Sequence, residues 1–260
     1  MQKAAIGLFQ GEKMNKNELK KYLDDLVIKY ETKDFIPNDP IQFPHRFTKK
    51  QDIEISGLIA SSLAFGKREK IIEAVEKVHK IIENEPYNFC TNFKNKDRKI
   101  FSEFKYRYIN GENLADLIEG ISKALQKYNS LEEIITKYDK NEYTTIKEGL
   151  TGFVEEILTC DNYLLPCPRK NSACKRLNLY MKWMTRKSQV DIGIWEQIDK
   201  SKLIIPLDVH VARVSRKLGL LERKANDWQS AYEITQILKE FDPKDPTKYD
   251  FALFGAGIGL

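Results

Sequence analysis

The sequence lacks any apolar run of the roughly 18–20 residues that a membrane-spanning helix requires. The N-terminus also lacks the apolar core of a secretory signal. We therefore expect a soluble protein. Residues 1–13 precede Met14, and we predict that they form a leader outside the fold. At 260 residues, the chain is long enough to bury a core as one large domain or as two lobes.

Cysteine is scarce, and the four present are Cys90, Cys160, Cys167 and Cys174. This low content indicates a reducing compartment rather than a disulfide scaffold, and we expect a cytoplasmic location. Zinc sites usually contain cysteine pairs two to four residues apart, and the last three cysteines are spaced more widely. An iron–sulfur cluster is the alternative to free, mostly buried thiols. We expect no metal and no cofactor.

No alternation of β-branched residues suggests a sheet, and no internal repeat or low-complexity tract occurs. Helical periodicity dominates instead. The amphipathic segments are 18–30, 52–65, 67–82, 113–128, 144–158 and 173–186. The proline-rich connector 35–47 (FIPNDPIQFPHRF) opposes helix, and Gly66 separates two of the helical segments. The sequence predicts an all-α protein.

Charge is unevenly distributed along the chain. The net charge is +5, but residues 166–225 contain 14 Lys and Arg against 5 Asp and Glu. Such asymmetry indicates a binding site for a polyanion, although a solvated basic face without a partner is the alternative. We predict two helical lobes with a basic cleft between them. Residues 14–50 pack with the C-terminal lobe (188–260), and residues 52–187 form the central lobe.

The basic block begins with LLPCPRKNSACKRLNLYMKWMTRK, in which two prolines precede a helix. Its predicted core face consists of Ala173, Leu177, Tyr180 and Met184. Its predicted opposite face consists of Lys175, Asn178, Lys182 and Arg186. A short helix or turn is expected at 191–199 (DIGIWEQID).

Lys175 lies in the first turn of this helix, where the helix dipole is positive. The dipole and the neighbouring Arg176 both favour the neutral amine, so we expect a lowered pKa. A neutral amine is the nucleophile that imine chemistry requires. A solvent-facing lysine with no chemical role is the alternative.

Asp208 ends an apolar run and begins a basic helix in LIIPLDVHVARVSRKLGL (203–220). Aspartate is a preferred N-cap, which by itself explains the residue. Facing Lys175 across one cleft, however, its carboxylate could stabilise an oxocarbenium-like transition state while the amine traps the anomeric carbon. The residues alone leave both interpretations open.

Further candidates fit a nucleic-acid ligand. The candidate phosphate contacts are Arg176, Lys182, Lys202, His210 and Arg213. The candidates for stacking on an extruded base are Phe43, His45, Arg46, Trp183 and Trp195. Packing in the core is the alternative for the aromatic residues.

The stretch IIPLDVHVARVSRKLGL (204–220) resembles the V-D-T-H-V-x-R signature of the helix–hairpin–helix DNA glycosylase superfamily. The resemblance implies a helix–hairpin–helix-like element and a catalytic role for Asp208. It also implies that Lys175 is the nucleophile of a bifunctional member, nearest to the archaeal 8-oxoguanine branch. LLPCPRKNSA (164–173) replaces the Gly-rich hairpin, and no cysteine follows Asp208, unlike in the endonuclease III group.

Four segments together resemble an uncharacterised bacterial family of unknown function: DPIQFPHRF, SACKRLNLYMKWM, IIPLDVHVARVSRKLGL and KYDFALFGAGI. The superfamily resemblance implies base excision repair of duplex DNA with a damaged base, by a DNA glycosylase with AP-lyase activity and 8-oxoguanine as the favoured lesion. The alternatives are a non-catalytic DNA- or RNA-binding module of the same fold and a helical adaptor for an acidic protein partner.

Overall fold

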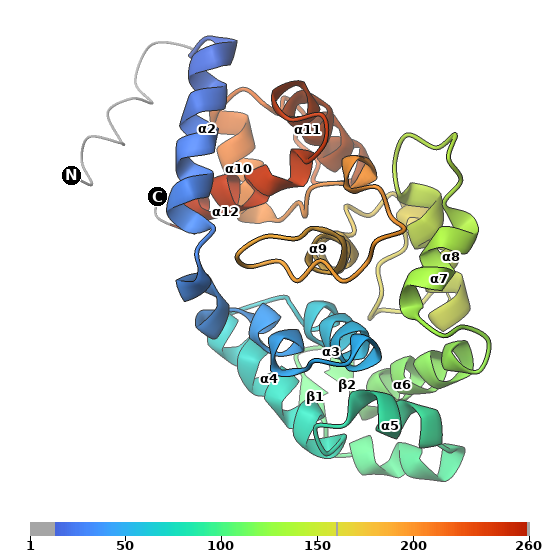
Figure 1. The fold of residues 1–260 in the computed structure, drawn as a ribbon. Helices are drawn as coiled ribbons and strands as arrows, with labels where there is room; N and C mark the ends of the chain where they lie inside the picture. Colours follow the sequence, from blue (N-terminus) through green and yellow to red (C-terminus); the bar gives the residue numbers. More distant parts are fainter. Residues whose placement is uncertain (1–13, 160, 259–260) are drawn as a thin grey trace.

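The computed structural model describes residues 14–159 and 161–258. The predicted all-α class is confirmed (Figure 1). The one sheet in the described ranges is a small hairpin of β1 (Lys105–Tyr106) and β2 (Ile109–Asn110). No helix in this part of the chain has the length and apolar character needed to cross a bilayer. The predicted leader, residues 1–13, lies outside the described residues.

The α-helices are α2 (Lys16–Tyr30), α3 (Lys50–Ser62), α4 (Arg68–Ile81), α5 (Pro86–Asn92), α6 (Gly111–Leu125), α7 (Leu131–Tyr138), α8 (Lys147–Ile157), α9 (Lys175–Thr185), α10 (Val209–Lys217), α11 (Trp228–Phe241) and α12 (Asp250–Ile258). The 3₁₀ helices are η1 (Lys33–Asn38), η2 (Pro40–Gln42), η3 (Pro44–Arg46), η4 (Asn95–Phe101), η5 (Pro168–Lys170), η6 (Lys200–Lys202) and η7 (Pro246–Tyr249).

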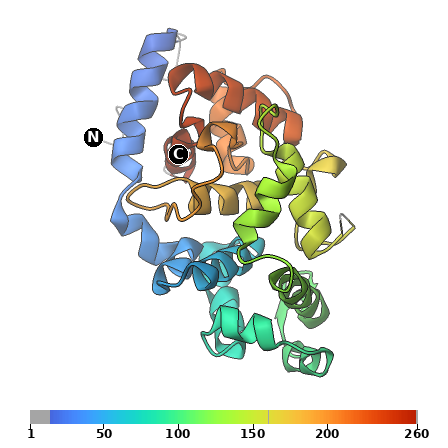
Figure 2. The same ribbon diagram turned by 45° about the vertical axis from the view of Figure 1, so that its right-hand side comes forward.

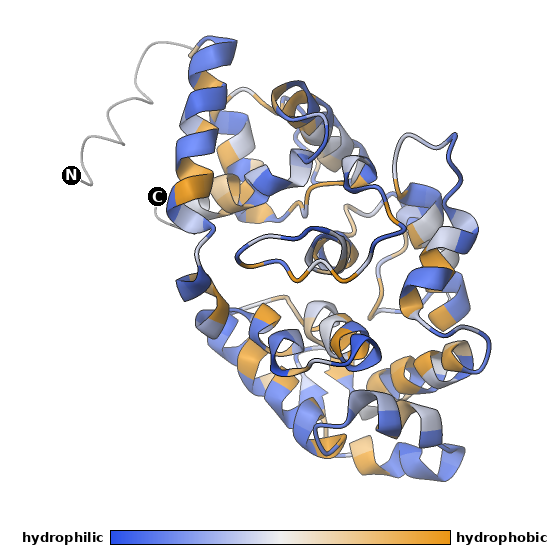
Figure 3. Cartoon of the chain, viewed as in Figure 1, coloured by the Kyte–Doolittle hydropathy of each residue, from blue (hydrophilic) through white to orange (hydrophobic). Residues whose placement is uncertain are grey.

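Local sequence signals explain several of these boundaries. Asn15 caps α2 by accepting hydrogen bonds from two backbone amides of the first turn, and the Glu18 carboxylate in turn accepts one from the Asn15 amide. The predicted break between α3 and α4 occurs at Gly66, whose φ of +106° favours glycine. Polar and apolar residues alternate along most helices, as expected for amphipathic elements (Figure 3).

Helix α9 lies at the centre of the molecule (Figures 1 and 2). It packs against α3 on one side, while α12 packs against both α2 and α10. Helices α6, α7 and α8 pack next to one another at the far side of α3. Helix α9 therefore connects the first half of the chain with its C-terminal helices, and the two-lobe division stays a prediction.

The C-terminal half of α9 carries charged residues into the core. Lys182 is 1% exposed, and its ammonium lies 3.1 Å from Asp191 and 3.3 Å from Asp250. The Lys182 Nζ also lies 3.7 Å from the centre of the Phe251 ring. These contacts supply the partners that a buried charge requires.

Arg186, at the C-terminal end of α9, is 4% exposed and contacts three carboxylates. Its guanidinium pairs with Glu31, lies 2.6 Å from Asp191 and lies 2.9 Å from Asp245. The sequence predicted that Asn178, Lys182 and Arg186 lie on the face of α9 opposite the core. This prediction is wrong, because all three side chains are buried. The partners come from distant segments, so helical spacing alone could not place them.

The segment 191–199 is irregular and extended rather than a short helix or turn. The backbone amides of Ile192 and Gly193 donate to the Trp183 carbonyl, and the Trp195 amide donates to the Met184 carbonyl. These bonds satisfy carbonyls that the end of α9 leaves without helical partners. The segment that directly follows α9 therefore folds back and pairs with the C-terminal end of the helix.

Two of the cysteines, Cys90 and Cys174, are free buried thiols as predicted. Burial raises the pKa of both, that of Cys174 to about 12, so neither thiol is activated. The free-thiol prediction is wrong for Cys167, which is disulfide-bonded. Cys160 lies outside the described residues.

We expect Lys182→Ala to destabilise the fold by about 3–5 kcal/mol, because it leaves buried carboxylates without their cation. The free energy of unfolding is measured by urea denaturation. Lys187→Ala, which removes an exposed lysine just beyond α9, is the control and should change it by less than about 0.5 kcal/mol. A loss below about 1 kcal/mol for Lys182→Ala would contradict a structural role for the ion pairs.

Candidate active site

Lys175 is the first residue of α9. The backbone turns into this helix through Asn171 and Cys174, both in the left-handed region with φ of 56° and 49°. The Trp228 amide donates to the Asn171 carbonyl, which fixes this turn against the start of α11. The partly buried Lys175 side chain crosses to the end of α3, where Nζ donates to the Ala64 carbonyl at 3.1 Å.

Asp208 is the N-cap of α10, as its position in the sequence predicts. Its Oδ1 accepts hydrogen bonds from the amides of His210 and Val211, at 2.8 and 2.9 Å. Its Oδ2 accepts no hydrogen bond from the described part of the chain. The buried extended run 203–207 leads into this cap, and the Ile205 amide donates to Thr235. Capping therefore occupies one carboxylate oxygen and leaves the other available.

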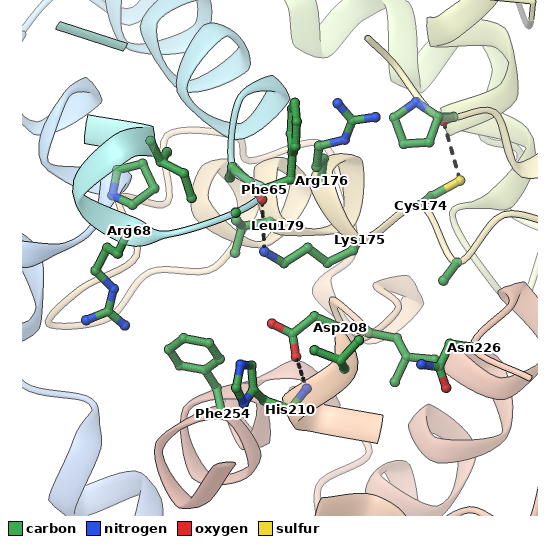
Figure 4. Close-up of a pocket in the computed structure, with 18 of the residues that line it drawn as sticks. Phe65, Arg68, Cys174, Lys175, Arg176, Leu179, Asp208, His210, Asn226 and Phe254 are labelled. Atoms are coloured by element: carbon green, nitrogen blue, oxygen red, sulfur yellow. Dashed lines mark hydrogen bonds between the residues drawn. The ribbon is translucent and has the colours of Figure 1, made fainter. Parts of the chain in front are cut away.

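The Lys175 ammonium and the Asp208 carboxylate point into one cavity from opposite sides (Figure 4). The cavity has a volume of about 860 Å³, within the usual range for small-molecule and cofactor sites. It lies where α4, α9 and α10 begin. Three helix N-termini at one cavity provide backbone N–H groups and positive dipole ends.

The charged side chains around the cavity are of both signs. The described residues that line it include three cations (Arg68, Lys175 and Arg176) and three carboxylates (Asp39, Glu69 and Asp208). The lining is therefore charged but not basic, in contrast to the cleft that the charge pattern predicted. No group of three or more His, Cys, Asp and Glu residues in the described ranges is arranged to hold a metal ion.

One wall of the cavity is aromatic. Phe254 packs edge-on against His210, with ring centres 6.3 Å apart, and the Arg68 guanidinium lies 5.6 Å from the centre of the Phe254 ring. Phe65 lines the opposite part of the cavity, and Arg176 lies 5.0 Å from its ring centre. These rings could face a planar ligand.

A smaller cavity of about 50 Å³ adjoins this site and shares Asp39, Lys175 and Asp208 with it. Trp183 and Asp250 also line it. Its volume suits about one water molecule and is too small for a purine. Burial raises the pKa of Asp250 to about 6 and also raises that of Asp39. Acids with raised pKa values thus lie beside the Lys175–Asp208 pair.

Residues 39–259 match the model of a family described as a protein of unknown function, DUF2400. The chain belongs to this family. The expected membership of an uncharacterised family is thereby confirmed, and the match includes both Lys175 and Asp208. No curated protein and no solved structure matches the chain.

Most of the predicted base-stacking residues lie elsewhere in this DUF2400 protein. Phe43 is fully buried and stacks on His79, with ring centres 5.1 Å apart. His45 bonds the Val190 carbonyl at 2.7 Å. Arg46 pairs with Glu76 at 2.8 Å and covers the Phe43 ring.

Trp195 is also buried, and its indole N–H donates to Glu54 at 2.6 Å. None of Phe43, His45, Arg46 and Trp195 lines either cavity, so the structure does not bring these four together with Lys175 and Asp208. Trp183 alone of the predicted set lines the smaller cavity.

Two of the predicted phosphate contacts line the large cavity. They are His210 and Arg176, whose guanidinium donates to the Ser62 carbonyl at 2.8 Å and to the Tyr163 carbonyl at 3.1 Å.

The other three predicted phosphate contacts lie away from it. Arg213 is exposed on α10, but its guanidinium donates to the Gly257 carbonyl. Lys202 is 12% exposed and lies 3.1 Å from Asp139. The buried Lys182 and the paired Lys202 are therefore poorly placed to contact a phosphate.

Four residues that line the cavity were not predicted from the sequence: Asp39, Phe65, Arg68 and Phe254. Asp39 and Phe254 fall in segments that carry the family resemblance, which was the available signal. Phe65 and Arg68 flank the Gly66 break, a position that helical periodicity marks only as a boundary.

Capping and chemistry at Asp208 are separable by substitution. We expect Asp208→Ala to lower the free energy of unfolding by about 1 kcal/mol, because the α10 amides lose their acceptor. Asp208→Asn should change it by less than about 0.5 kcal/mol, since an asparagine oxygen caps equally well. Urea denaturation measures both variants. Equal losses for Asn and Ala would show that the negative charge, and not the capping oxygen, stabilises the helix.

Proposed function

We propose that this protein is a DNA glycosylase with AP-lyase activity, acting on duplex DNA that contains an oxidised purine. The observation that carries the proposal is the pairing of Lys175 and Asp208, which belong to different helices and face each other across one cavity. The glycosylase resemblance assigns these same two residues to catalysis. It also makes 8-oxoguanine the favoured base.

The pair suits chemistry at the sugar carbon C1′. The Lys175 amine, in its unprotonated form, attacks C1′ as the N-glycosidic bond breaks. The electron pair of that bond leaves with the base, and the base takes up the proton that the newly bonded amine releases. The free Oδ2 of Asp208 stabilises the positive charge that develops on the sugar. The amine and C1′ then form an imine as the sugar ring opens. Loss of a proton from C2′ expels the 3′-phosphate and breaks the strand.

The rest of the cavity fits a nucleotide ligand. Its volume of about 860 Å³ exceeds what a purine requires, and Phe254 offers a face for an extruded base. Helix N-termini bind phosphate through their backbone amides, and the starts of α4 and α9 lie at the cavity. Together, these features fit an extruded nucleotide.

A non-catalytic DNA- or RNA-binding module is the second candidate. The hydrogen bond from Lys175 to the Ala64 carbonyl favours it, because this contact gives the lysine a structural role that needs no reaction. Such a module would bind nucleic acid without forming a covalent intermediate.

Borohydride trapping tests the proposal. The protein is incubated with duplexes that carry 8-oxoguanine, uracil or an abasic site, and borohydride then reduces any imine to a stable adduct. We expect an adduct with the 8-oxoguanine duplex and none with Lys175→Gln, whose amide keeps a donor for the Ala64 carbonyl but cannot form an imine. Asp208→Asn should reduce the rate of base release by at least tenfold, since the site loses the negative charge that stabilises the transition state.

Lys187→Ala is the matched control, because it removes an exposed lysine just after the same helix and should leave the adduct intact. An adduct with only the abasic duplex would support the lyase and contradict the assignment of the base. Absence of both adduct and base release, with DNA still bound, would contradict the enzyme and favour the binding module.

A further inference from the structure

A second hollow, of about 400 Å³, lies between α4 and the β1–β2 hairpin. Its lining is strongly basic, unlike that of the large cavity. The charged residues that line it are Lys67, Lys70, Lys77, Lys105 and Arg107, together with one carboxylate, Glu73. All of these side chains are exposed. We call this hollow the basic groove.

Most cations of the basic groove are not neutralised. Lys70 lies 2.7 Å from Glu73, whereas the other four form no ion pair within the described part of the chain. Lys67, Lys70 and Lys77 share one face of α4, and the first and last are separated by about 15 Å along the helix axis. One strand of B-DNA presents about four phosphates over that length, at 3.4 Å per nucleotide.

The backbone that carries the hairpin cations is anchored to the rest of the fold. The Tyr106 hydroxyl donates to the Phe65 carbonyl, which ties β1 to the end of α3. Arg107 adopts a left-handed conformation, with φ of 54°, at the hairpin turn. The Arg107 Nη1 lies so close to Gly66 that a Cβ there would be 2.8 Å away. A groove on an anchored backbone needs little backbone ordering when it binds an anion.

The basic groove and the large cavity share one wall. Phe65, Gly66 and Arg68 line the cavity, and Lys67 lines the groove. A strand with one nucleotide in the cavity can continue over this wall into the groove. A flat anionic membrane would leave both hollows unfilled, so their adjacency favours nucleic acid.

We infer that the basic groove binds the sugar–phosphate backbone beside the nucleotide that occupies the cavity. This inference rests on the proposed function for its ligand class. It adds a binding surface from α4 and the hairpin, outside the helices that carry Lys175 and Asp208. The cations contact phosphates and therefore supply affinity without reading sequence.

The test measures the binding of an undamaged duplex of about 20 base pairs by fluorescence anisotropy over a range of salt concentrations. In the triple variant Lys67→Ala, Lys77→Ala and Lys105→Ala, three phosphate contacts and their counterion release are lost. The slope of log K against log salt concentration should become less steep by about 3, and Kd should rise roughly 10- to 100-fold at 0.15 M salt.

The control is Lys21→Ala with Lys96→Ala and Lys99→Ala, which removes three exposed lysines that lie outside the groove. It lowers the net charge equally and should change Kd by less than threefold. Thermal unfolding midpoints of both triple variants, expected within a few degrees of the unmodified protein, exclude a folding defect.

Equal slopes and affinities for the two triple variants would overturn the inference. Weaker binding of the groove variant to phosphatidylserine vesicles, with DNA binding unchanged, would also overturn it, because the groove would then bind lipid headgroups. The readout uses undamaged DNA, so it is independent of the borohydride adduct. Groove-dependent binding without an adduct would contradict the proposed chemistry alone.

Discussion

The buried ion pairs of α9 determine where the candidate active site can form. Lys182 and Arg186 bind carboxylates from three other parts of the chain: Glu31 at the end of α2, Asp191 after α9, and Asp245 and Asp250 near α12. Removing charges from water is costly, so the pairs are formed only when these segments are correctly placed. The same helix carries Lys175 at its other end, and the ion pairs therefore fix its direction.

The site combines groups that each have an ordinary structural role. Lys175 bonds the Ala64 carbonyl just after α3, and Asp208 caps α10. Because α9 packs on α3 and α10 packs on α12, the two side chains line one cavity only when both sets of contacts are formed. Asp199 also caps a helix through one oxygen only, so what distinguishes the Asp208 cap is its position on the cavity that Lys175 lines. The chain belongs to a family of unknown function, and these two residues are where its chemistry is to be tested.

The sequence predicted α2, α3, α4, α6, α8, α9 and α10, together with the Gly66 break and the Asp208 cap, because these features depend on neighbouring residues. It did not predict α5, α7, α11 and α12. It failed where a side chain finds a distant partner. Lys182 and Lys202 looked like surface cations but pair with Asp250 and Asp139, while Trp195 bonds Glu54. The cavity wall was also hidden, since Asp39 and Phe254 come from opposite ends of the chain. Helical spacing contains no information on such contacts.

A crystal structure of the Lys175→Gln variant with a duplex that contains 8-oxoguanine tests the central claim most directly. The account predicts that the damaged nucleotide lies in the large cavity, with C1′ within about 3.5 Å of the residue 175 side chain and on the same side as Asp208 Oδ2. A complex in which the cavity holds only water, with an intact base pair bound elsewhere on the protein, would contradict it.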